Sequence, residues 1–161
     1  MIDYTFIELG INDVFGGILA QSDIDGVINN AKTLINAVLD TTYGYPGCKV
    51  ILAIPSIGGN SKDGYALNYG STVESEQYER NMRLLWESMI QTFENGAYKR
   101  NVRLSINGLM IDRYYGYGRS LVNVSQRDTT QIQEHTNGVH PISSGYFQLA
   151  DAFYSALRSL Q

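Results

Sequence analysis

The sequence predicts a single α/β domain built on a parallel sheet, and three observations carry this prediction. Segments with strand character alternate with helical segments along the chain, which is typical of parallel sheets. The run Val50–Ile54 is continuously apolar, as in a strand covered on both faces. The intervening segments place apolar residues at a spacing near 3.6. The 161 residues fit one domain, residues 1–161.

Composition and charge exclude several classes of protein. Hydrophobic residues make up 43% and charged residues 17%, which excludes intrinsic disorder. No apolar run reaches the ~18 residues of a membrane-spanning helix, so no membrane partner is expected. A net charge of -4 argues against a nucleic-acid partner. The first residues lack a basic segment, so no signal peptide is expected, and the sequence leaves the location open between virion, cell exterior and cytoplasm.

The one cysteine also limits the possible chemistry. A single Cys48 excludes an internal disulfide and a cysteine-based zinc site. Because it adjoins the run Val50–Ile54, we expect a buried, inert thiol.

The first third of the chain predicts a strand and a long helix. Tyr4–Leu9 reads as a short strand that ends at Gly10, and a polar loop follows to Ser22. We expect the helix to begin with Ser22 or Asp23 as N-cap and to stop at Gly44 and Pro46. Its apolar stripe consists of Ile24, Val27, Ile28, Ala31, Leu34, Ile35, Val38 and Leu39.

The middle of the chain repeats this order. Lys49–Ile54 is the second predicted strand, and Pro55 ends it. After a polar loop, Ser71 is expected to open the second helix, with Glu74 completing a capping box. The buried face of this helix is predicted to hold Tyr78, Met82, Leu85, Trp86, Met89, Ile90 and Phe93.

The last third predicts one more strand and one more helix. Val102–Ile106 is the third strand. The apolar Leu109–Ile111 follows Asn-Gly, so this stretch is either a hairpin or, as we prefer, a turn and a short extended continuation. Asp112–Thr136 is expected to be a long irregular segment, and such loops are usually functional. The last helix is expected from Ser143 to Leu160.

Two short motifs lie where a parallel sheet places its functional site, which is at the carboxyl ends of the strands. Leu9–Asp13 (Leu-Gly-Ile-Asn-Asp) follows the first strand directly. Asn137–Pro141 (Asn-Gly-Val-His-Pro) precedes Ser143–Tyr146 (Ser-Ser-Gly-Tyr) at the start of the last helix. Together these motifs resemble the SGNH (GDSL-type) hydrolases, whose blocks read Gly-x-Asn-Asp after a strand and Asp-x-x-His-Pro before the last helix. The resemblance covers the whole chain in element order. The residue sequence of Thr136–Pro141 is similar to that found in hydrolase domains of bacteriophages and their hosts.

The resemblance implies a fold, a reaction and a set of site residues. The fold would be an SGNH/flavodoxin-like three-layer sandwich, and the reaction would be ester hydrolysis by serine acyl transfer, with an acetylated carbohydrate as substrate. By motif, His140 would be the general base and Asn12 an oxyanion donor. Gly10 would let the backbone approach the substrate, and Asp13 would fix the loop. No cofactor and no metal are expected, because His135 and His140 lack carboxylates at metal-binding spacing.

The sequence departs from the family in two respects. Asn137 stands where the family has Asp, so it would orient the imidazole of His140 without a charge, which Asp112 or Asp128 could supply. The nucleophile block Gly-Asp-Ser is absent, and Ser61 follows the wrong strand. We therefore interpret the chain as the C-terminal part of an SGNH domain, with the serine supplied by a preceding polypeptide, a missing N-terminal segment or a partner chain.

An open strand edge follows from this interpretation. Tyr4–Leu9 would lack its neighbour in the sheet, so we expect it to pair with another polypeptide, either the missing N-terminal fragment or a second copy of this chain.

The alternative is a structural or carbohydrate-binding module of a phage virion or cell-surface protein that keeps the fold without the chemistry. In that reading Asn12 and Asp13 only cap a loop, and His140 is a core histidine. His135 is expected to be a solvated loop residue. A reading frame immediately upstream that encodes Gly-Asp-Ser would favour the enzyme.

Overall fold

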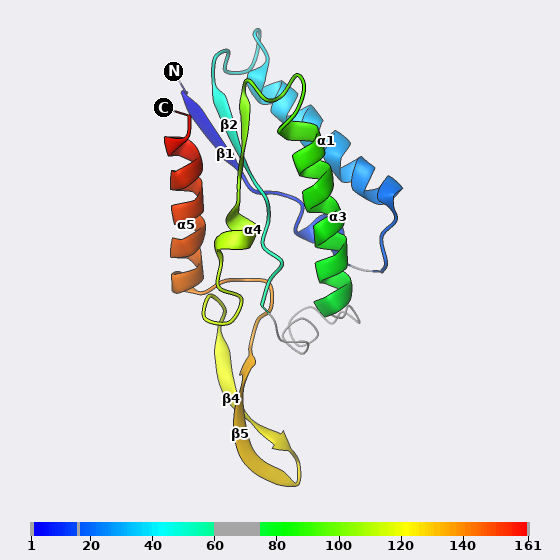
Figure 1. Cartoon of the computed structure of the whole chain (residues 1–161), viewed down its shortest axis with the longest axis vertical. Helices are drawn as coiled ribbons and strands as arrows, with labels where there is room; N and C mark the ends of the chain where they lie inside the picture. Colours follow the sequence, from blue (N-terminus) through cyan, green and yellow to red (C-terminus); the bar gives the residue numbers. More distant parts are fainter. Residues whose placement is uncertain (1, 16, 60–74, 161) are drawn as a thin grey trace.

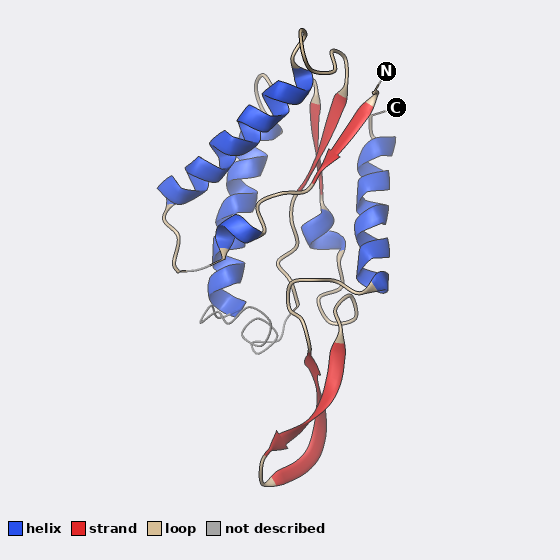
Figure 2. Ribbon diagram, turned by 180° about the vertical axis from the view of Figure 1, so that it is seen from behind, coloured by secondary structure: helices blue, strands red, loops and turns tan. Residues whose placement is uncertain are grey.

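The fold is a three-layer α/β arrangement. The computed structural model describes residues 2–15, 17–59 and 75–160. A three-stranded parallel sheet lies between α1 and α3 on one face and α5 on the other (Figures 1 and 2). The predicted α/β class with a parallel sheet is therefore confirmed.

The strands follow sequence order across the sheet. β1 (Tyr4–Ile7) pairs with β2 (Lys49–Ala53), which pairs in turn with β3 (Val102–Ser105). Tyr4 lies opposite Lys49, and Val50 lies opposite Val102. The central strand is buried on both faces, as its apolar run predicted. Each strand is one or two residues shorter than predicted.

The helices lie where the apolar periodicity predicted them, with different ends. α1 (Gln21–Leu39) has Ala20 rather than Ser22 or Asp23 as N-cap, because the Asp23 carboxylate reaches back to accept the Ala20 N–H at 2.8 Å. It ends before Gly44, because the Asp40 carboxylate accepts the N–H groups of Thr42 and Tyr43 and turns the chain.

The second and third helices complete the layers. α3 is described over Ser75–Phe93, so the expected capping box of Ser71 and Glu74 lies outside the described residues. α5 (Ser143–Arg158) packs on β2 and β3. In the part of the chain that the structure describes, no helix is long and apolar enough to cross a membrane.

The stretch after β3 differs from its prediction. Leu109–Ile111 is not an extended continuation, because Asn107–Met110 forms one helical turn, α4. The Gly108 N–H donates to the carbonyl of Ile54 at 2.8 Å, and a side chain at Gly108 would collide with Pro55 O and the Trp86 ring. These contacts involve residues distant in the sequence, so the local residue pattern around Gly108 could not predict them.

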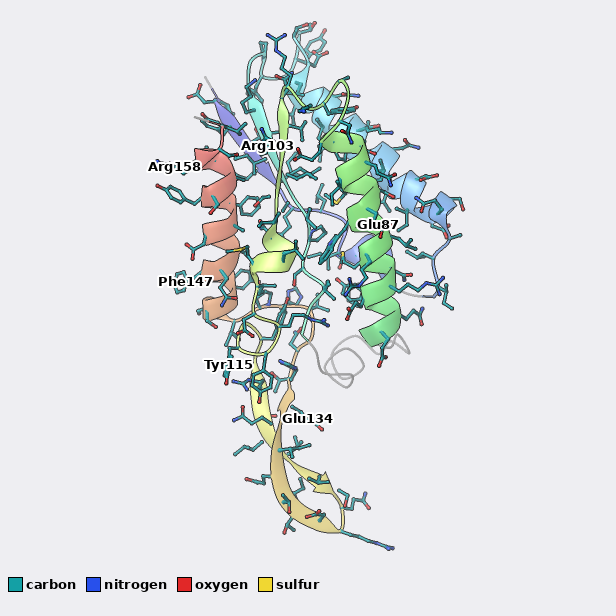
Figure 3. All side chains as sticks on the ribbon, in the orientation of Figure 1. Glu87, Arg103, Tyr115, Glu134, Phe147 and Arg158 are labelled. Carbon is teal, nitrogen blue, oxygen red and sulfur yellow. The ribbon has the colours of Figure 1, made fainter. Side chains whose placement is uncertain are left out.

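The segment Asp112–Thr136 was expected to be irregular, but it contains a β-hairpin. β4 (Arg119–Ser125) and β5 (Asp128–His135) pair antiparallel, with Val122 opposite Ile132. The ribbon projects from the body of the domain (Figures 1 and 2), and Figure 3 shows Glu134 on it and Tyr115 where it joins the body. Its strands were missed because most of their residues are exposed, so no alternation of buried and exposed positions marks them.

The main core lies between the sheet and the layer of α1 and α3. Its fully buried side chains include Val14, Ile24, Ile35, Val50, Met82 and Phe93. Cys48 is buried as predicted.

Candidate functional site

A pocket at the carboxyl ends of β1 and β2 brings together segments from both ends of the chain. Its volume is about 370 Å³. Four of the predicted site residues line it: Gly10, Asn12, Asp13 and His140. The other lining residues are Glu8, Leu9, Ile11, Ser56, Val139, Pro141, Tyr146 and Leu149.

The Gly10–Asp13 wall is held by backbone geometry and a buried amide. Gly10 has φ +100°, a conformation that favours glycine, and Asn12–Val14 form a 3₁₀ turn. The side chain of Asn81, fully buried in the middle of α3, donates to the carbonyls of Val14 at 3.2 Å and Gly17 at 3.0 Å. Asn81 therefore fixes the turn that carries Asn12, and sequence analysis did not identify it.

The His140 wall is a turn capped by Asn137. The Asn137 Oδ1 accepts the N–H groups of Val139 and His140, each at 2.9 Å. Val139 is buried in the main core and anchors this turn. Asn137 thus supports the backbone of His140, and its expected action on the imidazole stays a prediction.

Ser56 is a pocket residue that the sequence analysis did not consider. It follows β2 and is buried, with its Oγ 2.5 Å from the Tyr117 hydroxyl. The Oγ also accepts the Gly58 N–H at 3.0 Å. Burial raises the pKa of Tyr117 from 10.0 to about 12, so the phenol is neutral at ordinary pH and can donate. The sequence feature that could have identified Ser56 is its position, because its hydroxyl side chain comes two residues after the predicted strand Lys49–Ile54.

A half-buried carboxyl also lines the pocket. Burial raises the pKa of Glu8, and a hydrogen bond from Asn107 Nδ2 at 3.4 Å opposes that shift. Asn107 is itself buried and accepts the Ser105 hydroxyl. This carboxyl went unnoticed because it lies within the predicted strand Tyr4–Leu9.

Neither carboxylate considered as a source of charge for His140 lines this pocket. Asp112 accepts the N–H groups of Tyr114 and Tyr115 in an exposed turn, and these bonds lower its pKa. Asp128 lies in the projecting hairpin, where a bond from the Thr130 N–H lowers its pKa.

Two other residues considered in the sequence analysis are His135 and Ser61. The prediction of a solvated His135 is wrong, because the residue is only 2% exposed, with Nε2 3.2 Å from the Tyr114 carbonyl. The rings of Tyr114 and Tyr117 pack edge-on against it. Ser61 lies outside the described residues. Among residues 2–15, 17–59 and 75–160, no group of three His, Cys, Asp or Glu side chains could hold a metal ion.

Backbone hydrogen bonds tie the segment around His140 to two other parts of the chain, at Gly59 and Gly116. The Gly59 N–H donates to the Gly138 carbonyl at 2.8 Å, and the Ile142 N–H donates to Gly116 at 2.9 Å. His140, Asn12 and Gly10 thus line one cavity, and an imidazole, a side-chain amide and a glycine backbone are groups suited to proton transfer and to holding an oxyanion.

Comparison of this chain with protein-family models, with curated proteins and with solved structures finds no match.

Proposed function

We propose that this chain is the part of an SGNH-type ester hydrolase that carries the general base and the oxyanion donor. The observation that carries the proposal is the pocket shared by Asn12 and His140, which come from opposite ends of the sequence. His140 accepts the proton of a serine hydroxyl, and the Asn12 amide donates to the oxyanion that forms at the ester carbonyl. Gly10 lets the backbone approach the substrate.

The nucleophilic serine comes from outside residues 1–161. Among the residues that the structure describes, Ser56 is the serine that lines the pocket, and its Oγ is held by the Tyr117 hydroxyl and the Gly58 N–H. Because the pKa of Tyr117 is raised to about 12, the phenol is a poor base for activating Ser56. In this proposal Ser56 shapes the pocket wall, and another serine attacks the ester.

The proposed substrate is an acetylated carbohydrate. The pocket offers several polar side chains for sugar hydroxyls, among them Glu8, Asp13 and the Tyr146 phenol. Tyr146 is 53% exposed, so its ring provides an accessible apolar surface of the kind sugars bind. An acetyl ester is small enough for a cavity of about 370 Å³.

The proposal is tested with the chain alone and with the native assembly purified through a tag on this chain. The chain alone is expected neither to hydrolyse p-nitrophenyl acetate nor to bind a fluorophosphonate covalently. The native assembly is expected to release acetate from an O-acetylated glycan, and His140→Ala should lower kcat about 10²–10⁴-fold.

The matched control is Asp128→Ala, a change in the exposed hairpin that should leave kcat unchanged. Labelling of Ser56 in the chain alone, or equal acetate release by the His140→Ala assembly, would contradict the proposal. An assembly without any esterase activity would favour the binding or structural module.

A further inference from the structure

The outer side of helix α5 carries exposed aromatic and charged side chains at helical spacing. Phe147 is 72% and Tyr154 59% exposed. Asp151 and Arg158 are exposed as well. Because a helix turns by about 100° per residue, the positions four, seven and eleven residues after Phe147 share its face. We call these four residues the α5 stripe. It lies opposite the buried face of the helix, which holds Gly145, Leu149, Ala152 and Ala156.

The two charges of the α5 stripe are not used inside the domain. Among residues 2–15, 17–59 and 75–160, Asp151 and Arg158 make no ion pair. Helices α1 and α3 cover the other face of the sheet and lie away from the stripe (Figures 1 and 2). Figure 3 shows Phe147 and Arg158 near opposite ends of α5. An exposed helix face that combines aromatic side chains with arginine is typical of a protein–protein contact.

Apolar side chains of the neighbouring α4 add to this exposed surface. Helix α4 packs against α5. Its Leu109 is 64% and its Met110 45% exposed. Apolar surface that stays in water is unfavourable, so a partner seated on α5 would gain free energy by covering such side chains.

The order of side chains in the α5 stripe is complementary to itself when the direction is reversed. Two antiparallel helices related by a two-fold axis place residue i opposite residue j, and j opposite i. With the axis midway between Asp151 and Tyr154, Asp151 faces the partner's Tyr154, and Phe147 faces the partner's Arg158. The phenol can donate to the carboxylate, and the guanidinium can lie over the ring. Symmetry doubles both contacts, which then extend over roughly 16 Å of helix.

The parallel arrangement of two α5 helices does not fit the same stripe. Identical residues would then face each other, so Asp151 would meet the partner's Asp151 and Arg158 the partner's Arg158. Both contacts would bring like charges together. The antiparallel arrangement instead gives each of the four residues a complementary neighbour. The stripe therefore fits a second copy of this chain in the antiparallel direction.

We propose that two copies of this chain form a symmetric dimer through antiparallel α5 helices. Each α5 begins at the pocket, because Tyr146 in its first turn is a lining residue. The dimer brings the partner's Arg158 to Phe147, the residue after Tyr146, and places the two pockets at opposite ends of the shared interface. The contact depends neither on the open edge of β1 nor on the reaction proposed for the pocket.

The mass of the chain in solution tests the dimer. Light scattering across a dilution series should give twice 18.0 kDa at high concentration. Phe147→Arg should raise the Kd of the dimer about tenfold or more, because the new charge faces the partner's Arg158. Phe147→Glu should keep the dimer, because its carboxylate can pair with that guanidinium. The double variant with Phe147→Arg and Arg158→Glu should restore the dimer that Phe147→Arg weakens.

The matched control is Leu121→Arg, the same kind of change at an exposed residue of the projecting hairpin, which should leave the Kd unchanged. A chain that stays monomeric across the series would overturn the proposal. A dimer that Phe147→Arg leaves intact would also overturn it and would place the contact elsewhere, such as at the edge of β1. Equal weakening by Phe147→Arg and Phe147→Glu, without rescue in the double variant, would overturn the antiparallel pairing.

Discussion

The side-chain amide of Asn81 donates to the carbonyl of Val14 at 3.2 Å and so joins the middle of α3 to the turn that carries Asn12. Asn81 and Val14 are both fully buried. The same side chain also accepts the Leu19 N–H through its Oδ1, at 3.2 Å. One buried amide thus satisfies three backbone groups, at Val14, Gly17 and Leu19, in the segment that follows the pocket residues Gly10–Asp13.

Replacing Asn81 by Ala should therefore lower the free energy of unfolding by about 1–3 kcal/mol, because the buried Val14 carbonyl loses its donor. The backbone amide of Asn12 should also shift in an NMR spectrum. The control is Asn36→Ala, which removes an exposed hydrogen bond to Tyr98 and should change stability by less than about 0.5 kcal/mol. Equal urea midpoints for both variants would contradict this role.

Gly10→Ala should destabilise the protein by about 1–2 kcal/mol, since φ is +100° and an added Cβ would lie 2.9 Å from Leu85 Cδ2. Gly26→Ala provides the matched control. Gly26 lies inside α1, and an added Cβ there meets nothing within 4 Å, so this change should stabilise by about 0.5–1 kcal/mol. Thermal unfolding of the two variants should move in opposite directions.

The raised pKa of Tyr117 predicts how stability depends on alkaline pH. Folding favours the neutral phenol, so its contribution to stability is complete below pH 10.0 and is lost as pH rises towards about 12. The loss should be roughly 2–3 kcal/mol. Urea unfolding at several pH values measures it: the advantage of the wild type over Tyr117→Phe should shrink between these pH values, and a constant difference would argue against the shift.

In the proposed hydrolase assembly, kcat should depend on His140 far more than on Asn137. The Asn137 oxygen holds two backbone N–H groups, so Asn137→Ala loosens the turn without removing the base. Asn137→Asp keeps the acceptor oxygens and should retain the turn. A loss of kcat for Asn137→Ala as large as for His140→Ala would show that Asn137 acts on the imidazole directly.

Asn12→Ala in the same assembly should lower kcat by about 10²–10³-fold with little change in KM, because an oxyanion donor acts in the transition state. Steady-state kinetics on an O-acetylated glycan separate the two parameters. A higher KM at constant kcat would instead assign Asn12 to substrate binding.

The local pattern of apolar and polar residues was enough to predict the parallel sheet and the position of the pocket. The run Val50–Ile54 predicted a strand because burial on both faces leaves no polar position to confuse the pattern. Gly10–Asp13 and His140 were predicted together because parallel strands place their carboxyl ends at one edge of the sheet. These predictions use information carried within a few residues of each element.

The missed features depend on contacts between distant residues. Asn81 reads as an ordinary polar residue of an amphipathic helix, although it is fully buried against the Val14 turn. His135 has polar neighbours in sequence and is buried by the rings of Tyr114 and Tyr117. Ser56 gains its place in the pocket wall from Tyr117, 61 residues away.

The pocket has one wall near each end of the sequence, and this fixes when it can form during synthesis. A ribosome completes β1, β2 and β3 before it releases the turn of His140 and helix α5. Closing so long a loop is slow, because entropy must be lost before the contacts form. The nascent chain can therefore assemble its sheet early, whereas the cavity closes only after the turn of His140 and helix α5 have left the ribosome.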